Sequence, residues 1–440
     1  MPWAALSNDC SGVRVIFNYI NITLSLIFLF FTSFPLPAQT TDYRGIPAGF
    51  DYPADKARLE QYRQAGNLSA LRKHGWLLFA GMTREQADGT PYWLTWYHVD
   101  ETFRAAGTEL QHPRPMALPF ETPNQFEHPL PGQQAPPASV LSFVLFNREG
   151  YQHIRTEHLY QRSRLNELNS SFLPSQPWNE RKIPDFPARA VTLKTIWWPV
   201  RGDGMTALPI WDNQPAQPID QLNVNQFIHW QRVVAVDAGR QSVADGEFID
   251  TVYNAKTYRH AHVVGLGSFY RVKVDAALAR AVMQSKDSGV RISIQHALGR
   301  ELRAGDYLLF IGMHATSKEI DDWTWQTYWW HDRPDAGPYA SGRPDAVKGV
   351  WRNYLMASAD DEVLPREPDG TPHIGYNPWL EAHFPNGVLS NCMSCHHRAS
   401  YPVIGFLPIT RGAPDPASDP AFKPRRLQTD FMWSIIERSN

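Results

Sequence analysis

Two cysteines and a histidine near the C-terminus have the spacing C-x-x-C-H, in the sequence Cys392-Met393-Ser394-Cys395-His396. This spacing is the attachment signature of c-type haem. The two thiols can form thioethers with the vinyl groups of a haem, and the histidine that follows can bind the iron. The sequence therefore predicts one covalent haem c on Cys392 and Cys395, with His396 as the proximal iron ligand.

Two other interpretations of the cysteine pair are a thioredoxin-type disulfide and half of a zinc site. A thioredoxin motif sits near the start of a β-α-β unit, whereas this pair lies late in the chain without one. A zinc site needs further thiolates or well-spaced histidines. Haem attachment is the interpretation that the sequence favours.

The sixth ligand of the iron is open among several side chains. Met432 is the first choice, because it is the methionine that follows the motif and a thioether ligand suits electron transfer. Met356 lies upstream, and His373 or His383 would give bis-histidine ligation. His397 adjoins the proximal ligand, so the backbone would have to fold back for it to reach the other face. An open iron position is the remaining alternative.

Other polar and aromatic residues have weaker claims. Arg398 is predicted to bind the cofactor by pairing with a haem propionate, since a guanidinium suits carboxylates; a solvated arginine is the alternative. Tyr401 and Trp433 pack either on the macrocycle or in an ordinary core. His260 and His262 lie on one face of an expected strand, a spacing that can bind zinc, but without a third ligand we expect ordinary histidines.

The composition bounds the class of protein. The 440 residues carry a formal net charge of −2, so no basic field attracts nucleic acid. Aromatic residues make up 12% of the chain, including sixteen tryptophans, which supports a large core. Thirty-six prolines indicate many turns and irregular connections. The length suggests two or three domains.

The N-terminus predicts export. Arg14 is followed by the almost wholly apolar stretch 15–34, and Leu36-Pro37-Ala38 resembles a cleavage site. We therefore expect a signal peptide over residues 1–38 and a periplasmic protein; the alternative is an uncleaved membrane anchor. Cys10 would leave with the signal peptide, so the mature chain would keep only the cysteines of the motif.

The fold class expected from the sequence is mainly β with some α. We expect a sandwich-like β-rich body, with one unit over 40–190 and a second over 191–364, and a small loop-and-helix haem c segment over 365–440. Proline-rich connections fall at 112–138 and 173–187. The expected helices are 50–72, 275–284 and 429–438. The expected strands are 76–82, 93–98, 140–146, 191–198, 230–236, 262–274, 307–313 and 323–330.

An internal similarity suggests that the two β-rich units are related. Residues 77–82 resemble 308–313, and residues 94–100 resemble 326–332. Both pairs predict an apolar strand followed by an aromatic strand, so two related units are expected, with coincidence as the alternative. The paired tryptophans at 197–198 and 329–330 send neighbours to opposite sides of a strand, for core packing or for a groove.

Residues 391–397 resemble the haem-binding region of cytochrome c proteins. With the Gly-Met and tryptophan-rich elements, the chain resembles a group of exported bacterial single-haem proteins of unassigned function. The resemblance implies covalent haem c, His396 as an axial ligand and a periplasmic setting, and it implies no substrate. In small cytochromes c the motif comes near the start of the domain, whereas here it comes late.

The expected function is electron transfer by one haem that exchanges electrons with a redox partner protein. The alternative is a haem-dependent oxidoreductase or sensor whose open iron position binds peroxide or a diatomic ligand. A third reading makes the haem structural. A membrane is a partner only if the N-terminal segment is uncleaved.

Overall fold

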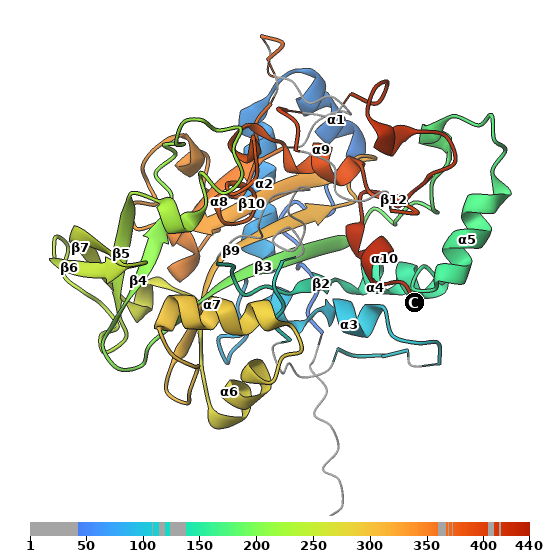
Figure 1. The fold of residues 1–440 in the computed structure, drawn as a ribbon. Helices are drawn as coiled ribbons and strands as arrows, with labels where there is room; N and C mark the ends of the chain where they lie inside the picture. Colours follow the sequence, from blue (N-terminus) through green and yellow to red (C-terminus); the bar gives the residue numbers. More distant parts are fainter. Residues whose placement is uncertain are drawn as a thin grey trace, which may run out of the picture. The chain divides into compact units, whose positions relative to one another are not determined.

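In a computed structural model of the protein, the described residues are 43–107, 109–113, 119–123, 138–359, 367, 369–371, 373–403, 409–412 and 415–440 (Figure 1). The predicted signal peptide and most of the proline-rich stretch 112–138 lie outside them. Contacts group Gln39–Asn440 into one unit. With 30% helix and 23% strand the architecture is mixed α/β, so it holds more helix than the sequence analysis expected.

The largest sheet has seven strands in the order β1-β2-β3-β9-β10-β11, with β8 paired to one end of β9, and every pairing in it is antiparallel. Its long central strands β3 and β9 pair from Val191 opposite Ser317 to Val200 opposite Tyr307. The strands are β1 (Tyr97–His98), β2 (Val144–Phe146), β3 (Val191–Val200), β8 (Arg271–Lys273), β9 (Tyr307–Ser317), β10 (Thr324–Trp330) and β11 (Tyr354–Ser358).

Two smaller sheets complete the strand content of the described residues, and none of the three sheets closes on itself. The four-stranded sheet has the order β4-β5-β7-β6, in which β5 and β7 are parallel. The third sheet is a two-stranded pair near the C-terminus. These strands are β4 (Met205–Ile210), β5 (Arg232–Asp237), β6 (Phe248–Tyr253), β7 (Lys256–Gly265), β12 (Ser400–Tyr401) and β13 (Leu427–Gln428).

The helices are short, and several begin at an Asn or Asp whose side chain accepts a backbone N–H of the first turn. Asn67 caps α2 in this way and Asp275 caps α6. No described helix has the length and apolar character that crossing a membrane requires. The helices are α1 (Lys56–Gln64), α2 (Leu68–Met82), α3 (Val99–Thr102), α4 (Arg148–Thr156), α5 (Arg162–Ser171), α6 (Ala276–Met283), α7 (Ser288–Leu298), α8 (Pro378–Glu381), α9 (Cys392–His397) and α10 (Trp433–Arg438).

The expected strand at 76–82 is wrong, because these residues form the second half of α2. The helix packs closely on its neighbours. A Cβ atom added to Gly75 would come within 2.7 Å of Gln326, and one added to Gly81 within 2.8 Å of Ile46. Phe79 stacks on Tyr328 with ring centroids 4.2 Å apart. The apolar run is therefore a buried helix, which its composition alone does not distinguish from a buried strand.

This finding removes the internal similarity as evidence for related units. Residues 77–82 are helical, whereas the similar residues 308–313 belong to strand β9. Residues 94–100 span a 3-10 turn, the short strand β1 and the start of α3, whereas 326–332 begin in β10. The two segments share residue types and not a structure, so coincidence is the correct reading.

Other expectations agree better with the structure. The strands expected at 191–198, 230–236, 307–313 and 323–330 are β3, β5, β9 and β10 with small shifts at their ends, and the helix expected at 275–284 is α6. The strand at 140–146 is limited to β2, and 262–274 divides into the end of β7, a 3-10 turn and β8. The paired tryptophans are all buried in the core, as the packing interpretation predicted.

The seven-stranded sheet has two faces of different character. Tyr328 and Met356 are register partners on one face, and Tyr328 donates a hydrogen bond to the Gly75 carbonyl of α2. On the opposite face, Lys194 of β3, His314 of β9 and Thr327 of β10 lie side by side in one row. Strands β2 and β3, expected in different units, are neighbours in this sheet.

Candidate haem-attachment site

The motif forms the one-and-a-half-turn helix α9, which is fixed at its start by backbone hydrogen bonds. The Cys392 N–H donates to Gly375 at 2.9 Å, and the Cys395 N–H donates to Asn391 at 3.1 Å. Neither thiol is joined in a disulfide. Residues three apart share one face of a helix, so α9 presents the two sulfurs on one side. The thioredoxin-type disulfide interpretation gains no support from this arrangement.

His396 is oriented by a backbone carbonyl. Its Nδ1 lies 2.9 Å from the carbonyl oxygen of Phe431, which can only accept, so Nδ1 carries the proton and Nε2 has the free electron pair. Burial lowers the pKa of His396 to about 4, which keeps the ring neutral at neutral pH. Histidines that bind metals donate their second N–H to such an oxygen. His396 therefore has the geometry of an Nε2 metal ligand.

The turn that supplies this carbonyl is held by the rest of the protein. Asp430 accepts from Lys318 Nζ at 2.6 Å and from the Trp323 indole at 3.2 Å, and the Lys318–Asp430 ion pair is buried. Asp430 and Phe431 have φ values of 48° and 67°, a left-handed conformation that phenylalanine rarely adopts. The Thr429 N–H and hydroxyl both donate to the Ala399 carbonyl, just beyond α9.

Arg398 is engaged by a partner within the chain. Its Nε donates to Asp419 Oδ2 at 2.8 Å, and both side chains are 6% exposed. A buried carboxylate therefore occupies the position that we predicted for a haem propionate beside Arg398. The side chain that the sequence identified as cofactor-binding instead joins α9 to the segment that carries Asp419.

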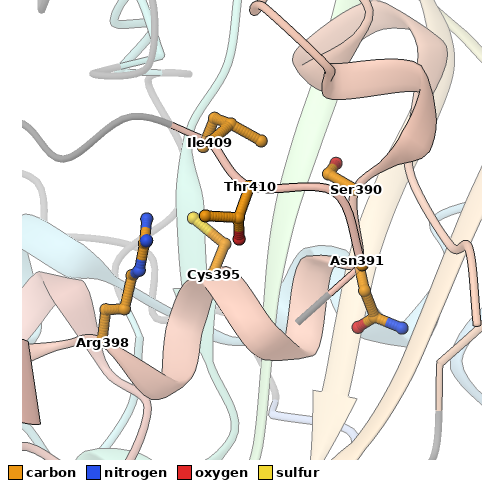
Figure 2. Close-up of a pocket in the computed structure, with 7 residues that line it drawn as sticks. Ser390, Asn391, Cys395, Arg398, Ile409 and Thr410 are labelled. Atoms are coloured by element: carbon orange, nitrogen blue, oxygen red, sulfur yellow. The ribbon is translucent and has the colours of Figure 1, made fainter. Parts of the chain in front are cut away.

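The thiol of Cys395 points into a small hollow (Figure 2). The hollow has a volume of about 10 Å³, far below the roughly 300–1,000 Å³ of typical ligand pockets, and is lined by Ser390, Asn391, Arg398, Ile409, Thr410 and Gly412 besides Cys395 itself. Burial raises the pKa of Cys395 to about 11, so the group is a thiol at neutral pH. This hollow holds the sulfur and is too small for a macrocycle.

Two polar side chains of the sheet lie near α9. Lys194 and His314 keep accessible surface, although the other interior positions of β3 and β9 are buried. Burial lowers the pKa of Lys194, and the positive charge of Lys194 helps to hold the pKa of His396 low. Both side chains lie on the same sheet face as Trp325, whose ring packs against His396.

Glu381 of α8 is held at both of its carboxylate oxygens. Its Oε1 lies 3.1 Å from His314 Nε2, and its Oε2 accepts the N–H of Asn377 at 2.7 Å. Asn377 in turn donates to Thr327 Oγ1 at 2.7 Å. The polar row of the sheet is thus connected through α8 to the neighbourhood of the motif, and Trp325 on the same sheet face lies 4.6 Å from the His396 ring.

The donor set fits a haem c. The two thiols lie on one helix face and outside any disulfide, and a neutral histidine has one nitrogen committed to a carbonyl and the other available. These features are what covalent attachment and iron binding require of the protein.

The predicted methionine ligands are both buried. Met432 follows Phe431, whose carbonyl binds the Nδ1 side of the His396 ring. Met356 lies on the other face of the sheet, where a Cβ at Gly75 of α2 would be 3.2 Å from its sulfur. Both are core residues.

The histidines that were predicted as alternative ligands each contact other residues of the chain. His373 Nε2 lies 2.7 Å from the Ser358 carbonyl, and its Nδ1 contacts Glu367. The buried His383 ring lies against Phe384, with centroids 4.1 Å apart. The His397 ring stacks on Phe431 at 4.7 Å.

The remaining predicted residues have structural roles. Tyr401 donates to Asn166 Oδ1 at 2.7 Å, and Trp433 opens the terminal helix α10. His260 stacks on Phe248 at 3.9 Å, and His262 Nδ1 lies 3.2 Å from Asp332. Within the part of the chain that the structure describes, no three His, Cys, Asp or Glu side chains are grouped to hold a metal ion.

The sequence analysis missed Lys194, His314 and Glu381. A signal for the first two was present, because Lys194 is a charged residue inside the expected strand 191–198 and His314 is a titratable residue directly after the expected strand 307–313. Period-two alternation gives their faces but not their pairing, which depends on the register between β3 and β9. Glu381 comes from a short helix that the sequence did not indicate.

Comparison of the chain with protein-family models, with curated proteins and with solved structures gave no match in any of the three. What the protein does must therefore be inferred from its own residues.

Proposed function

We propose that this protein is an exported c-type haem protein that carries one haem, attached to Cys392 and Cys395, and transfers electrons. The observation that supports it most is His396. This residue completes the attachment motif, its Nδ1 is bound to a backbone carbonyl, and its Nε2 is available to a metal. Residues 365–440 are the proposed haem-binding segment, and the sheet body supplies the surface on which a small segment can bury a macrocycle.

When bound, a haem supplies reversible one-electron chemistry between ferrous and ferric iron. The chain contributes attachment, orientation and exclusion of water. The thiols fix the cofactor to α9, and the Phe431 carbonyl orients His396. The Trp325 ring packs against the histidine, and Phe431 packs against Trp325, which keeps the environment of His396 apolar. Low polarity and a hydrogen-bonded axial histidine are the protein's means of setting a potential.

The setting that we propose is the periplasm, because residues 1–38 have the pattern of a signal peptide and attachment of haem c is an extracytoplasmic process. A redox partner protein that exchanges electrons with the haem belongs to the same proposal, as does membrane association if the N-terminal segment stays on the chain.

The test is a pyridine haemochrome spectrum with intact-mass measurement of protein purified from the exported fraction. We expect the spectrum of a thioether-bound haem and a mass equal to the processed chain plus one haem. A mass equal to the bare polypeptide, with both thiols free or joined in a disulfide, would refute the proposal.

An open iron position is the second candidate, and the positions of the methionines favour considering it. Met432 follows the residue whose carbonyl binds His396 Nδ1, and Met356 lies on the opposite sheet face, which argues against a distal thioether from either. An enzyme or sensor that binds peroxide or a diatomic ligand would have such a vacancy. Carbon monoxide added to the ferrous protein separates the cases: a sharp shift of the Soret band indicates an open position, and an unchanged band indicates six-coordinate electron transfer.

A further inference from the structure

A row of three side chains crosses the sheet face that is turned toward α9. Val144 of β2, Lys194 of β3 and His314 of β9 are register partners, and all three keep accessible surface. Trp325, which packs against the His396 ring with centroids 4.6 Å apart, lies on the same face of the sheet. The row therefore lies on the side of the sheet where the motif is, and His314 is the imidazole in it.

His314 is prepared for metal binding in the same way as His396. Its Nε2 is committed to an oxygen, because it lies 3.1 Å from Glu381 Oε1. Its Nδ1 makes no hydrogen bond with the residues that the structure describes. Either ring nitrogen can bind a metal, and the nitrogen that binds is set by the hydrogen bond of the other. The two histidines thus have opposite tautomers, each with one nitrogen available.

The position of Glu381 strengthens this arrangement. The Asn377 N–H and the His314 ring hold its two oxygens, and the Asn377 side chain is bonded to Thr327 of β10. The carboxylate is therefore held on the sheet and on α8 together. A carboxylate behind an imidazole fixes the ring and makes it a stronger donor, which is the usual support of a metal-binding histidine.

We propose that His314 is the second axial ligand of the haem attached to α9, and that Glu381 is the positioning residue for its imidazole. The proposal rests on the proposed function, since it needs a haem on Cys392 and Cys395. It replaces the methionine expected from the sequence by a histidine from the sheet body. The iron would then join the C-terminal segment to strand β9.

The wild-type protein offers a test that needs no variant. Near-infrared magnetic circular dichroism and electron paramagnetic resonance of the ferric protein distinguish bis-imidazole, imidazole–amine and imidazole–thioether ligation. We expect the bis-imidazole signature. An amine signature would point to Lys194, a thioether signature to a methionine, and a high-spin spectrum to an open position; each of these would overturn the proposal.

Substitution identifies the histidine. We expect His314→Ala to turn the ferric protein from low spin to high spin, and added imidazole to restore the low-spin spectrum. The matched control is His373→Ala, which removes a histidine whose two nitrogens are engaged by Ser358 and Glu367 and should leave the spectrum low spin. A low-spin His314→Ala protein without added imidazole would overturn the proposal.

Haem content, measured by pyridine haemochrome on the same samples, separates this inference from the proposed function. Equal haem in the wild-type protein and in His314→Ala with a changed spin state supports both. No covalent haem in the wild-type protein overturns both. For Glu381→Gln we expect unchanged haem content, a low-spin spectrum and a higher reduction potential, because a neutral amide donates less charge through the imidazole. An unchanged potential would refute the role of Glu381.

Discussion

The two faces of the seven-stranded sheet have different physical tasks. One face carries Tyr328 and Met356 against α2 and is sealed by aromatic packing. The opposite face carries Lys194 and His314, which keep accessible surface. Burying a lysine or a histidine costs free energy unless a partner compensates. We therefore expect the apolar face to contribute more to the stability of the fold than the polar face.

The largest expected effect is on covalent haem content, and it tests whether a cofactor is attached next to the polar face. We expect the double variant Cys392→Ala/Cys395→Ala to lose all covalent haem, because both thioether positions are removed. Haem content is measured by pyridine haemochrome and intact mass. The matched control is Cys10→Ser, which changes the cysteine outside the motif and should keep full haem. Covalent haem on the double variant would contradict the attachment site.

A second substitution breaks the apolar face. Phe79 of α2 is fully buried and stacks on Tyr328. We expect Phe79→Ala to lower the free energy of unfolding by about 3–5 kcal/mol, because a large cavity replaces the ring. Urea denaturation measures the loss. Leu173→Ala, at a residue 68% exposed, is the control and should change stability by less than about 0.5 kcal/mol. Equal losses of unfolding free energy from the two substitutions would contradict the expectation that packing on this face stabilises the fold.

Adjacent positions of β3 sharpen the comparison within one strand. Leu193 and Lys194 point to opposite faces. We expect Leu193→Ala to cost about 2–5 kcal/mol of unfolding free energy, and Lys194→Met to be close to neutral or stabilising, because a buried charge is exchanged for an apolar side chain of similar size. Urea denaturation of both variants checks the contrast. A large loss of stability on Lys194→Met would show that the polar face also serves the fold.

The smallest expected effect concerns pH. Burial lowers the pKa of His98 to about 3, so the folded protein keeps this ring neutral while the unfolded chain takes up a proton near pH 6.5. The contribution of His98 is thus fully present above pH 6.5 and is lost as the pH falls from 6.5 toward 3. The slope is at most about 1.4 kcal/mol per pH unit.

Urea denaturation between pH 7.5 and 5 measures this slope. His98→Phe should flatten it, because phenylalanine keeps the contact with Phe143 (5.1 Å between ring centroids in the native protein) without a titrating group. A slope unchanged by His98→Phe would exclude His98 as its origin.

Much of the body was predictable because its patterns are local. Strands β3, β9 and β10 have continuous apolar and aromatic runs, and α6 has a capping aspartate. The run at 76–82 was mistaken for a strand because its packing partners are distant in sequence. Among these partners are Gln326, which packs next to Gly75, and Ile46, which packs next to Gly81. Tertiary contacts decide such ambiguous segments.

The candidate site divides in the same way. His396 and the cysteines follow from their fixed spacing, which the chain displays without any folding argument. The carbonyl of Phe431, the carboxylate of Glu381 and the imidazole of His314 meet the motif only through the fold. The choice of Met432 as distal ligand stays a prediction for this reason, since order along the chain does not specify which side chains face His396 Nε2.

The buried ion pair of Lys318 and Asp430 links the sheet body to the hydrogen bond that orients the His396 ring. The pair fixes the turn whose carbonyl holds the His396 proton. The strength of that hydrogen bond sets how much negative charge the ring offers to a metal. With the proposed haem bound, a substitution of Lys318, just beyond the end of β9, would therefore change the reduction potential through this hydrogen bond while every attachment residue stays the same.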